Sequence, residues 1–484
     1  MPVLATIGTD SLRPYGYALG LPRDPYFSSN RLLLSGIGTN GANNNTFTDS
    51  TGNNTVTRTG NVTQGSDSPF TTLPNTPYNA PVSAGSAGFD GSGDYLSVPD
   101  SAALEPGSGN FCIEFWFYPT TLLGTSTLLT KRAAGSGFGP YLIQRITDTI
   151  YISLSSNGTS WDILNAEPLL GVLTANIWYR VVLYRDGNNF YAGCVNTSGT
   201  QLLVNSASAL VNNTSAIYIG GDTNTNYFFG NIGSSRITIG SSVYTGTTSP
   251  APTSPYTNDG ANTKLLLNFA AAGIYDGTQY NNFQTLAGAT ISTSLYKWGT
   301  SSINFTAATT GYMQTIDGSA VGLGGGNFTV DGWVYMPSLL TMYLLDIDGG
   351  TNTAGRFGIR INSAGTIAIV GTGLSAFFTT SATYPLVAAT WTHLAVMRTS
   401  SDLGVYLNGR RINSAFTNTT TFTGSYNGGF AIGGLYTGAG TGGSGGINLQ
   451  DFRITPGVAR FTASTTLGAQ AFTPPASQAP LVGP

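Results

Sequence analysis

The chain has 484 residues, of which 40% are apolar and only 8% are charged, with a net charge of −3. This length suits two or three domains. The charged fraction is low, because an average soluble protein carries charge on about a quarter of its residues. No basic run occurs, which excludes a duplex nucleic-acid binder and disfavours electrostatic membrane binding. Polarity comes mainly from Ser, Thr and Asn. Such a surface suits a rigid extracellular or particle-borne protein better than a charged cytosolic enzyme.

The beginning of the sequence lacks the basic region and the apolar stretch of a signal peptide. No apolar run approaches the length of a membrane span. We therefore expect a soluble protein that is made in a host cytoplasm without Sec export and is not inserted into a membrane. Release inside a virus particle is another route out of a cell.

Two cysteines, Cys112 and Cys194, both lie in the first half of the chain. Two cysteines cannot form a disulfide framework or a four-ligand zinc site. The pattern favours two buried free thiols on strands, although one bridge is possible.

Residues 1–30 contain many aromatic residues and prolines but show no strand pattern. Exposed aromatic residues of this kind usually mark a docking segment. We interpret residues 1–30 as an arm that docks onto another chain; the alternative is an ordered extension packed on the first domain. The predicted docking side chains are Tyr15, Tyr17, Leu19, Leu21, Tyr26 and Phe27.

Much of the first half of the sequence recurs in the second half at a nearly constant offset. Gly107–Pro119 resembles Gly324–Pro337, and the tryptophans Trp116 and Trp333 are 217 residues apart. Further collinear matches pair Asn176–Arg185 with Thr390–Arg398, Ala216–Gly221 with Ala431–Gly434, Arg236–Thr238 with Arg453–Thr455 and, at the longer offset of 233, Leu32–Leu34 with Leu265–Leu267.

These matches define two copies of one domain, predicted over residues 31–247 and 262–476. The Pro-rich residues 248–261 between them predict a short, stiff, extended linker. Residues 477–484 form a C-terminal tail.

Both copies have the residue pattern of strands. Residues 111–118 are apolar on both faces, which is typical of a strand buried inside a sandwich. Other short β-branched runs are separated by Gly, Asn, Asp and Pro, which favour turns, and no stretch has helical apolar spacing. The predicted fold class is all-β: two tandem antiparallel β-sandwich (jelly-roll) domains with an N-terminal extended arm.

Several stretches resemble known families. Residues 111–119, 391–396 and the 405–409 hairpin are similar to the laminin G-like, concanavalin A-like jelly roll. The closing segments 452–461 and 472–475 resemble the domain ends of tailed-phage virion proteins. The arm segment 18–27 resembles virion structural proteins of marine cyanobacterial phages. The resemblance covers nearly the whole chain and implies a jelly-roll fold and a place in a phage virion.

The second copy departs most from the family pattern. Gly332 stands where the first copy has Phe115, and residues 438–446 are rich in glycine. These departures argue against a ligand site that both copies share.

The sequence offers little for acid–base catalysis. Its one histidine, His393, matches Arg180 of the first copy, and arginine does not deprotonate at working pH. We interpret His393 as a structural strand residue. Glu114 and its match Asp331 each stand alone on a strand, whereas a glycosidase needs two carboxylates about 5–10 Å apart. We predict no catalytic residue and a protein that is not an enzyme.

Metal and sugar sites have only a few candidates. Asp90 and Asp94 share one turn, and they are weak candidates for a Ca²⁺ site in the first copy; a solvated turn is the favoured interpretation, and no other cofactor is predicted. The tryptophans that repeat between the copies are expected in the core. Trp161, Tyr227 and Phe228 are not repeated and lie near loops rich in Asn, Ser and Thr, so they are the carbohydrate-binding candidates.

Together these features favour a structural component of a phage virion surface, in a head decoration, a fibre or the tail. It would dock by its arm and display two rigid sandwiches, with other virion proteins and further copies of itself as partners; a trimer is the favoured oligomer. The alternative is a carbohydrate-binding adhesin that recognises host surface polysaccharide through loops at one end. An extracellular cell-adhesion protein would need an export signal.

Overall fold

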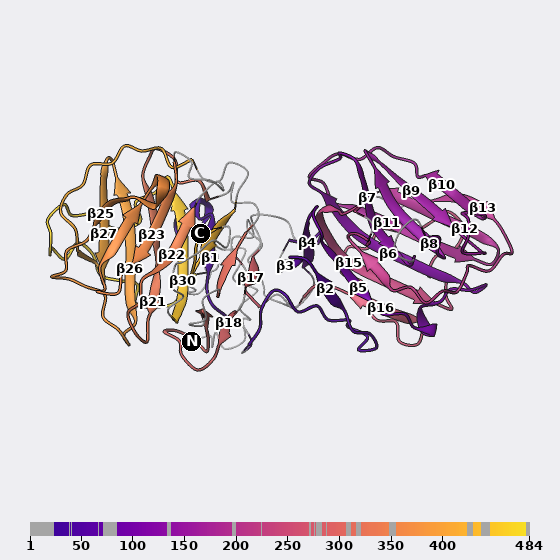
Figure 1. The fold of residues 1–484 in the computed structure, drawn as a ribbon, viewed down its shortest axis with the longest axis horizontal. Helices are drawn as coiled ribbons and strands as arrows, with labels where there is room; N and C mark the ends of the chain where they lie inside the picture. The colour runs from indigo at the N-terminus through magenta and orange to yellow at the C-terminus, as the bar shows by residue number, and fades with distance from the viewer. Residues whose placement is uncertain are drawn as a thin grey trace, which may run out of the picture.

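The computed structural model contains four antiparallel sheets arranged as two sandwiches (Figure 1). Among the residues that it describes it contains no α-helix, and three short 3-10 turns are η2 (Phe27–Ser29), η3 (Ala102–Leu104) and η5 (Thr372–Leu374). The described residues are 24–37, 39, 41–65, 67–70, 85–132, 137–195, 200–223, 225–270, 273–274, 276, 283–286, 288–305, 311–315, 321–347, 355–423, 429–436 and 446–480. The predicted all-β class is confirmed.

The first sandwich pairs an eight-stranded sheet with a seven-stranded sheet. The larger sheet has the order β13 (Gln201–Asn205), β12 (Asn189–Val195), β11 (Tyr179–Asp186), β6 (Phe111–Pro119), β15 (Phe229–Ile239), β4 (Ser86–Asp90) and β3 (Thr63–Gly65), with β16 (Thr263–Leu267) also paired to β15. The smaller sheet has the order β10 (Leu164–Pro168), β9 (Thr149–Leu154), β8 (Tyr141–Ile146), β7 (Thr125–Thr130), β14 (Ile217–Ile219), β5 (Tyr95–Val98) and β2 (Thr57–Thr59).

The second sandwich repeats this plan. Its larger sheet has the order β18 (Ala289–Ser292), β19 (Ser302–Phe305), β30 (Ile447–Pro456), β21 (Phe328–Tyr335), β26 (Thr392–Thr399), β27 (Asp402–Leu407) and β28 (Arg410–Arg411), with β1 (Leu32–Leu34) also paired to β30. Its smaller sheet has the order β17 (Gln284–Leu286), β20 (Tyr312–Gln314), β29 (Phe430–Ile432), β22 (Met342–Ile347), β23 (Phe357–Ile361), β24 (Ile367–Val370) and β25 (Ala376–Thr379).

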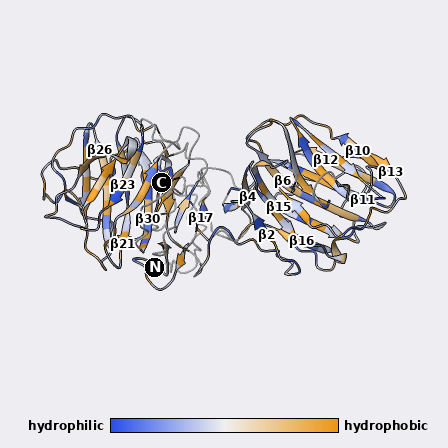
Figure 2. Cartoon of the chain, viewed as in Figure 1, coloured by the Kyte–Doolittle hydropathy of each residue, from blue (hydrophilic) through white to orange (hydrophobic). Residues whose placement is uncertain are grey.

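The central strand β6 shows why this sequence forms a sandwich. Alternate residues from Phe111 to Phe117 enter the apolar core between the two sheets. The residues between them, Cys112, Glu114 and Trp116, face the opposite side of the sheet and are also buried. Both faces of β6 are therefore buried, one against the core and the other beneath a further layer of chain. Figure 2 shows orange, which marks hydrophobic residues, along strands of both sandwiches.

The two copies exchange their first strands. β1, which precedes all strands of the first sandwich in the chain, pairs with β30 of the second, with Leu33 opposite Arg453. β16, which belongs by sequence to the second copy, pairs with β15 of the first, with Leu266 opposite Arg236. In Figure 1 the indigo β1 accordingly lies within the orange second sandwich. The predicted domain boundaries differ from this arrangement, because each leucine strand lies in the sandwich opposite to the one predicted.

The exchanged strands are part of the cores that they enter. Leu32 and Leu34 belong to the apolar cluster of the second sandwich, whereas Leu265 and Leu267 belong to that of the first. Burying one leucine side chain contributes roughly 1.5–3 kcal/mol. Each sandwich thus obtains part of its apolar stabilisation from the other copy's sequence.

Two connections run between the sandwiches, one from β1 to β2 and one from β16 to β17. Buried polar side chains hydrogen-bond these connections to each other. Asn44 is fully buried; its Oδ1 accepts from the Ile274 N–H at 2.9 Å, and its Nδ2 donates to the Ile274 and Phe283 carbonyls at 2.6 and 2.8 Å. Buried aspartates bind both exchanged strands in the same way: the Leu266 N–H donates to Asp49 and the Leu33 N–H donates to Asp276, each at 2.9 Å. The crossing therefore has its own hydrogen-bond partners, as a buried backbone requires.

The Pro-rich residues 248–261, predicted as a short, stiff, extended linker, pack against the first sandwich. Ser249 and Tyr256 are buried, and the guanidinium of Arg180 donates to the Ser249 carbonyl at 3.0 Å and to the Tyr256 hydroxyl at 3.1 Å. This segment folds back over the first sandwich because a buried arginine and an apolar surface are available to it. Proline content alone does not show that packing.

Both cysteines are buried and unbridged, as the favoured interpretation predicted. Cys194 on β12 lies in the main core of the first sandwich, whereas Cys112 lies in the layer on the other side of the sheet. Opposite sides of one sheet place the two sulfur atoms in separate environments.

A search of the described residues for a helix long and apolar enough to cross a membrane finds none.

The strand exchange predicts that a core truncation acts on the opposite copy. Leu34→Ala should cost about 2–5 kcal/mol and should weaken the second sandwich, whereas Leu267→Ala, its matched control, should weaken the first. Hydrogen exchange measured by mass spectrometry is the readout. We expect Leu34→Ala to lower protection along β30 and Leu267→Ala to lower it along β15. Faster exchange of β15 in the Leu34→Ala variant would contradict the exchanged arrangement.

Candidate functional site

A buried carboxylate lies on the outer face of the larger sheet in the second sandwich. Asp331, on β21, is 1% exposed; its Oδ2 accepts from Nη2 of Arg453 at 2.5 Å and lies 3.2 Å from Nε2 of His393. Burial alone would raise the pKa of Asp331, but Arg453 and the bond to His393 outweigh it and hold the pKa below its ordinary value. Asp331 is therefore ionised and paired at neutral pH.

A β-bulge brings a second acid to the same place. Asp451 and Phe452 of β30 together oppose Gly332 of β21, and Asp451 has a φ of +52°. A Cβ at Gly332 would come within 2.8 Å of the Phe452 Cα, so a larger residue does not fit there. This contact explains why the second copy has glycine where the first has Phe115.

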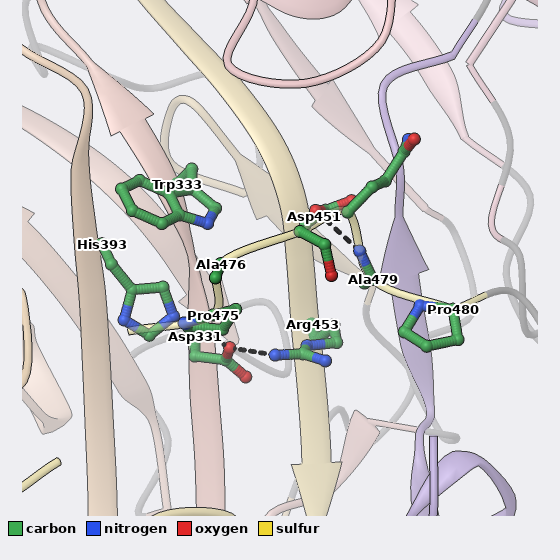
Figure 3. A pocket seen from close by; sticks show the side chains of 11 residues that line it. Asp331, Trp333, His393, Asp451, Arg453, Pro475, Ala476, Ala479 and Pro480 are labelled. Carbon is green, nitrogen blue, oxygen red and sulfur yellow. Dashed lines mark hydrogen bonds and ion pairs between the residues drawn. The ribbon is translucent and has the colours of Figure 1, made fainter. Parts of the chain in front are cut away.

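The C-terminal segment after β30 covers this face. Phe461 and Phe472 stack at 4.4 Å between ring centroids, and residues 475–480 close over the two acids. The Ala479 N–H donates to Oδ2 of Asp451 at 2.9 Å. Between this segment and the sheet lies a cavity of about 130 Å³, lined by Asp331, Trp333, His393, Asp451, Arg453 and residues 475–480 (Figure 3).

Asp451 has the opposite titration behaviour from Asp331. It is 4% exposed, and burial raises its pKa to about 7, although the Ala479 N–H and Arg453 oppose that rise. Two carboxyl groups that line one cavity thus differ in protonation near neutral pH. Such a difference is found in acid–base catalytic pairs; here both groups lie beneath residues 475–480 of the protein's own chain.

The first sandwich contains the corresponding arrangement with different side chains. Glu114 accepts from Arg236 at 2.6 and 2.9 Å, from Arg180 at 2.9 Å and from the Tyr244 hydroxyl at 2.9 Å. Removing one partner of such a buried pair costs about 3–5 kcal/mol, because a charge is left unpaired. The acids that match between the copies are therefore both held in buried ion pairs with arginines.

The end of the N-terminal arm is part of the second sandwich. Asp24 is buried and accepts from Arg460 at 2.8 Å, and Asn30 accepts from Thr455 at 2.8 Å. The ring of Tyr26, 38% exposed, lies 5.3 Å from the Arg460 guanidinium carbon. The interpretation of an extension packed on the first domain is thus wrong for residues 24–30, which contact the second. Phe27 lies in η2 and is half-buried; Tyr15, Tyr17, Leu19 and Leu21 lie outside the described residues.

The structure does not unite the three carbohydrate-binding candidates on one surface. Phe228 is fully buried in the core, 6.3 Å from Phe89 and 6.2 Å from Phe117 between ring centroids, so its proposed role in sugar stacking is wrong. Tyr227 is half-buried beside Gly221. Trp161 is half-buried and packs edge-on against Phe138 at 5.3 Å.

The weak calcium candidates are hydrogen-bonded within their own turn and to Asn61. Asp94, 1% exposed, accepts from the backbone N–H groups of Asp90 and Asn61 at 3.0 and 2.7 Å. Asp90 accepts from the Ser92 N–H and the Asn61 side chain. Burial and the neighbouring Asp90 raise the pKa of Asp94 to about 6. Over the part of the chain that the structure describes, no group of three His, Cys, Asp or Glu side chains is placed to hold a metal ion.

Sequence reasoning identified Glu114 and Asp331 but missed the arginines that hold them. The available signal was the repeated Arg-Ile-Thr stretch, which places Arg236 and Arg453 at matching positions. Asp451 had no such signal, because its counterpart in the first copy is Ser234. Only the bulge brings it into the site.

Family comparison assigns both copies to one fold family. The Laminin_G_3 model, described as the concanavalin A-like lectin/glucanases superfamily, matches residues 90–238 and 307–458. No curated protein sequence matches the chain.

Three solved structures illustrate the likeness at low identity. The binding domain of Paraclostridial Mosquitocidal Protein 1 is 14% identical (TM-score 0.30), over 39% of this chain and 47% of that chain, so the match spans about half of its length. Mouse laminin α1 LG4-5 is 12% identical (TM-score 0.28), over 80% of this chain and 92% of that one. The laminin α2 LG1-3 region is 13% identical (TM-score 0.34), over 77% and 63%.

The pKa of Asp451 predicts a pH-dependent stability. The unfolded chain loses this proton near pH 4, whereas the folded chain holds it to about pH 7, so the free energy of unfolding should fall as pH rises through this interval. Asp451→Asn cannot ionise and keeps an acceptor for the Ala479 N–H. It should match the wild type near pH 4 and exceed it at pH 8 by up to about 4 kcal/mol, at about 1.4 kcal/mol per pH unit.

Urea unfolding at pH 4, 6 and 8 measures this difference. Asp331→Asn is the control with the opposite sign, since it removes the partner of the buried Arg453 and should destabilise the protein at neutral pH by about 3–5 kcal/mol. A difference between Asp451→Asn and the wild type that stays constant from pH 4 to pH 8 would show that Asp451 is ionised throughout.

Proposed function

This chain belongs to the Laminin_G_3 family, the concanavalin A-like lectin/glucanases superfamily. We propose that it is a non-enzymatic structural component of a phage virion surface. It attaches through residues 1–23 of the arm and displays two joined β-sandwiches. The location on a virion is supported by the resemblance of residues 18–27, 452–461 and 472–475 to virion proteins.

The observation that carries this proposal is that the acid on the central strand of each sandwich is buried in ion pairs. Glu114 and Asp331 occupy matching positions on β6 and β21, and both are buried in ion pairs beneath their own chain. Groups held in this way stabilise a scaffold and are not free to exchange protons with a substrate. Stable presentation of a surface is what this arrangement supports best.

The strand exchange supports the display function. Since β1 lies in the second sandwich and β16 in the first, the chain passes between the two sandwiches twice, from β1 to β2 and from β16 to β17. A particle surface protein benefits from this double connection, because two links restrict the relative movement of the sandwiches more than one linker does.

Deletion of residues 1–23 tests attachment while keeping the contacts of Asp24 and Asn30 with the second sandwich. Wild-type protein should be found on purified particles by mass spectrometry and immunogold labelling. The Δ1–23 variant should keep the wild-type melting temperature and be lost from particles, whereas deletion of residues 481–484 should leave incorporation unchanged. Absence of the wild-type chain from particles, or full incorporation of Δ1–23, would refute the proposal.

A carbohydrate-binding adhesin that recognises host surface polysaccharide is the second candidate. It is favoured by one observation: Trp161 is half-buried, packs against Phe138, and sits in a loop fixed by bonds from Ser155 and Ser156 to Asp162. A partly exposed indole held by such a loop is suited to stack on a sugar ring.

A glycan array probed with the full chain tests this second function. Trp161→Ala should reduce any bound signal at least tenfold, because it removes the indole that stacks on the sugar ring while the loop hydrogen bonds remain. Tyr151→Ala, which removes another half-buried aromatic of the same sandwich on β9, is the matched control and should leave the signal unchanged. An array without signal for the wild type would leave display as the sole function.

A further inference from the structure

The segment that covers the outer face of each larger sheet makes one equivalent hydrogen bond in the two sandwiches. In the first sandwich the Tyr256 N–H donates to Oγ of Ser234 at 3.0 Å. In the second, the Ala479 N–H donates to Oδ2 of Asp451 at 2.9 Å. Ser234 and Asp451 occupy the same position in the bulges of β15 and β30. Ala479 is therefore the structural counterpart of Tyr256, with a methyl group in place of a hydroxyphenyl ring.

The Tyr256 ring has a defined set of neighbours. It packs in one cluster with Trp116, its hydroxyl accepts from Nε of Arg180 at 3.1 Å, and the Arg236 guanidinium carbon lies 5.1 Å from its centroid. The residue is 4% exposed. The first sandwich thus fills this space with its own hydroxylated ring.

The corresponding neighbours of Ala479 line the cavity of about 130 Å³. Trp333 replaces Trp116, His393 replaces Arg180 and Arg453 replaces Arg236 (Figure 3). A cavity of about 150 Å³ holds one benzene ring in a protein core, so this space has the size of a single six-membered ring. Tyr256 fills the equivalent space in the first sandwich.

Four residues that line this cavity each carry a buried polar atom that has no hydrogen-bond partner among the described residues. These atoms are Nδ1 of His393, Nε of Arg453, Nε2 of Gln478 and Oδ1 of Asp451. His393, Asp331, Asp451 and Arg453 are each at least nine-tenths buried. A buried polar atom left without a partner costs about 1–3 kcal/mol, which a ligand with a hydroxyl group would recover.

We propose that the cavity of the second sandwich is a binding site for a hydroxyphenyl ring, which takes the place that Tyr256 occupies in the first sandwich. The ring lies against Trp333 and Arg453, and its hydroxyl bonds to Nδ1 of His393, the residue in the position of Arg180. The ligand is a tyrosine side chain of a partner polypeptide or a small free phenol. The site is independent of where the chain is located on a particle.

Isothermal titration of the full chain with p-cresol and with N-acetyl-L-tyrosinamide tests this site. We expect saturable binding of p-cresol with one site per chain. Comparable binding of N-acetyl-L-tyrosinamide identifies a polypeptide source, whereas p-cresol binding alone identifies a small phenol. Either result supports the proposal.

Two variants distinguish this cavity from any other place where p-cresol binds. Ala479→Tyr fills the site from within, so it should raise the melting temperature by several degrees and weaken p-cresol binding at least tenfold; Ala479→Leu serves if the tyrosine variant does not fold. Tyr256→Ala creates the same cavity in the first sandwich and should raise the stoichiometry from one site to two. Unchanged binding in the filled variants overturns the proposal.

The wild-type titration also has outcomes that refute the site. No binding of p-cresol would show that the cavity holds solvent only. Binding of monosaccharides such as glucose or galactose, with none of phenols, would reassign the cavity to a sugar and overturn the hydroxyphenyl assignment. Neither outcome depends on residues 1–23, so failure here is separate from failure of the display function.

Discussion

The reciprocal exchange of two leucine strands is the constraint on which the rest of the structure depends. β1 completes the sheet of the second sandwich and β16 completes that of the first, in the same register relative to the arginine that recurs at the matching position of each partner strand, Arg453 and Arg236. Asn44 satisfies the backbone where the two connections pass each other. The second sandwich is therefore built from two separate stretches of chain, β1 and β17–β30, whereas the first contains the uninterrupted series β2–β16.

The second shared feature is a buried acid beneath a covering segment. In each copy a carboxylate on the central strand pairs with an arginine from the neighbouring last strand, Glu114 with Arg236 and Asp331 with Arg453. Paired charges of this kind are costly to bury and costly to break, so they favour one defined position of the segment that covers them. A chain with few charged residues uses several of them in its interior, which leaves a surface dominated by uncharged hydrogen-bonding groups.

The sequence was sufficient to predict the fold class and the duplication. Strand alternation is a local signal, as in the apolar stretch at residues 111–118. The collinear matches are a pairwise signal between the two copies. The destination of Leu32–Leu34 was not predictable in this way, because the matching leucines of both copies fit the same position in either sandwich equally well. The packing of Tyr256 was likewise hidden by prolines, which predict an extended backbone but not what it contacts.

The candidate site illustrates a different limit. Glu114 and Asp331 were identified because they repeat, whereas Asp451 reaches the cavity only through a bulge opposite Gly332. The role of Ala479 is evident only from the structure, which shows that its N–H makes the same contact as that of Tyr256. Phe228 was assigned to a surface because its neighbours in the sequence are polar, yet its side chain points inward and is fully buried in the core. Residue type and loop composition do not determine which way a side chain points.

Both ends of the described chain lie on one sandwich. Asp24 and Asn30 bind Arg460 and Thr455, and Ala479 binds Asp451, so the first described residue and the C-terminal segment are both fixed to the second sandwich. In a chain tethered by its beginning, the copy encoded last therefore sits nearest the anchor, and the copy encoded first forms the outermost lobe. Tension applied between the two ends would be borne by the inner lobe alone, and the outer lobe would remain unloaded.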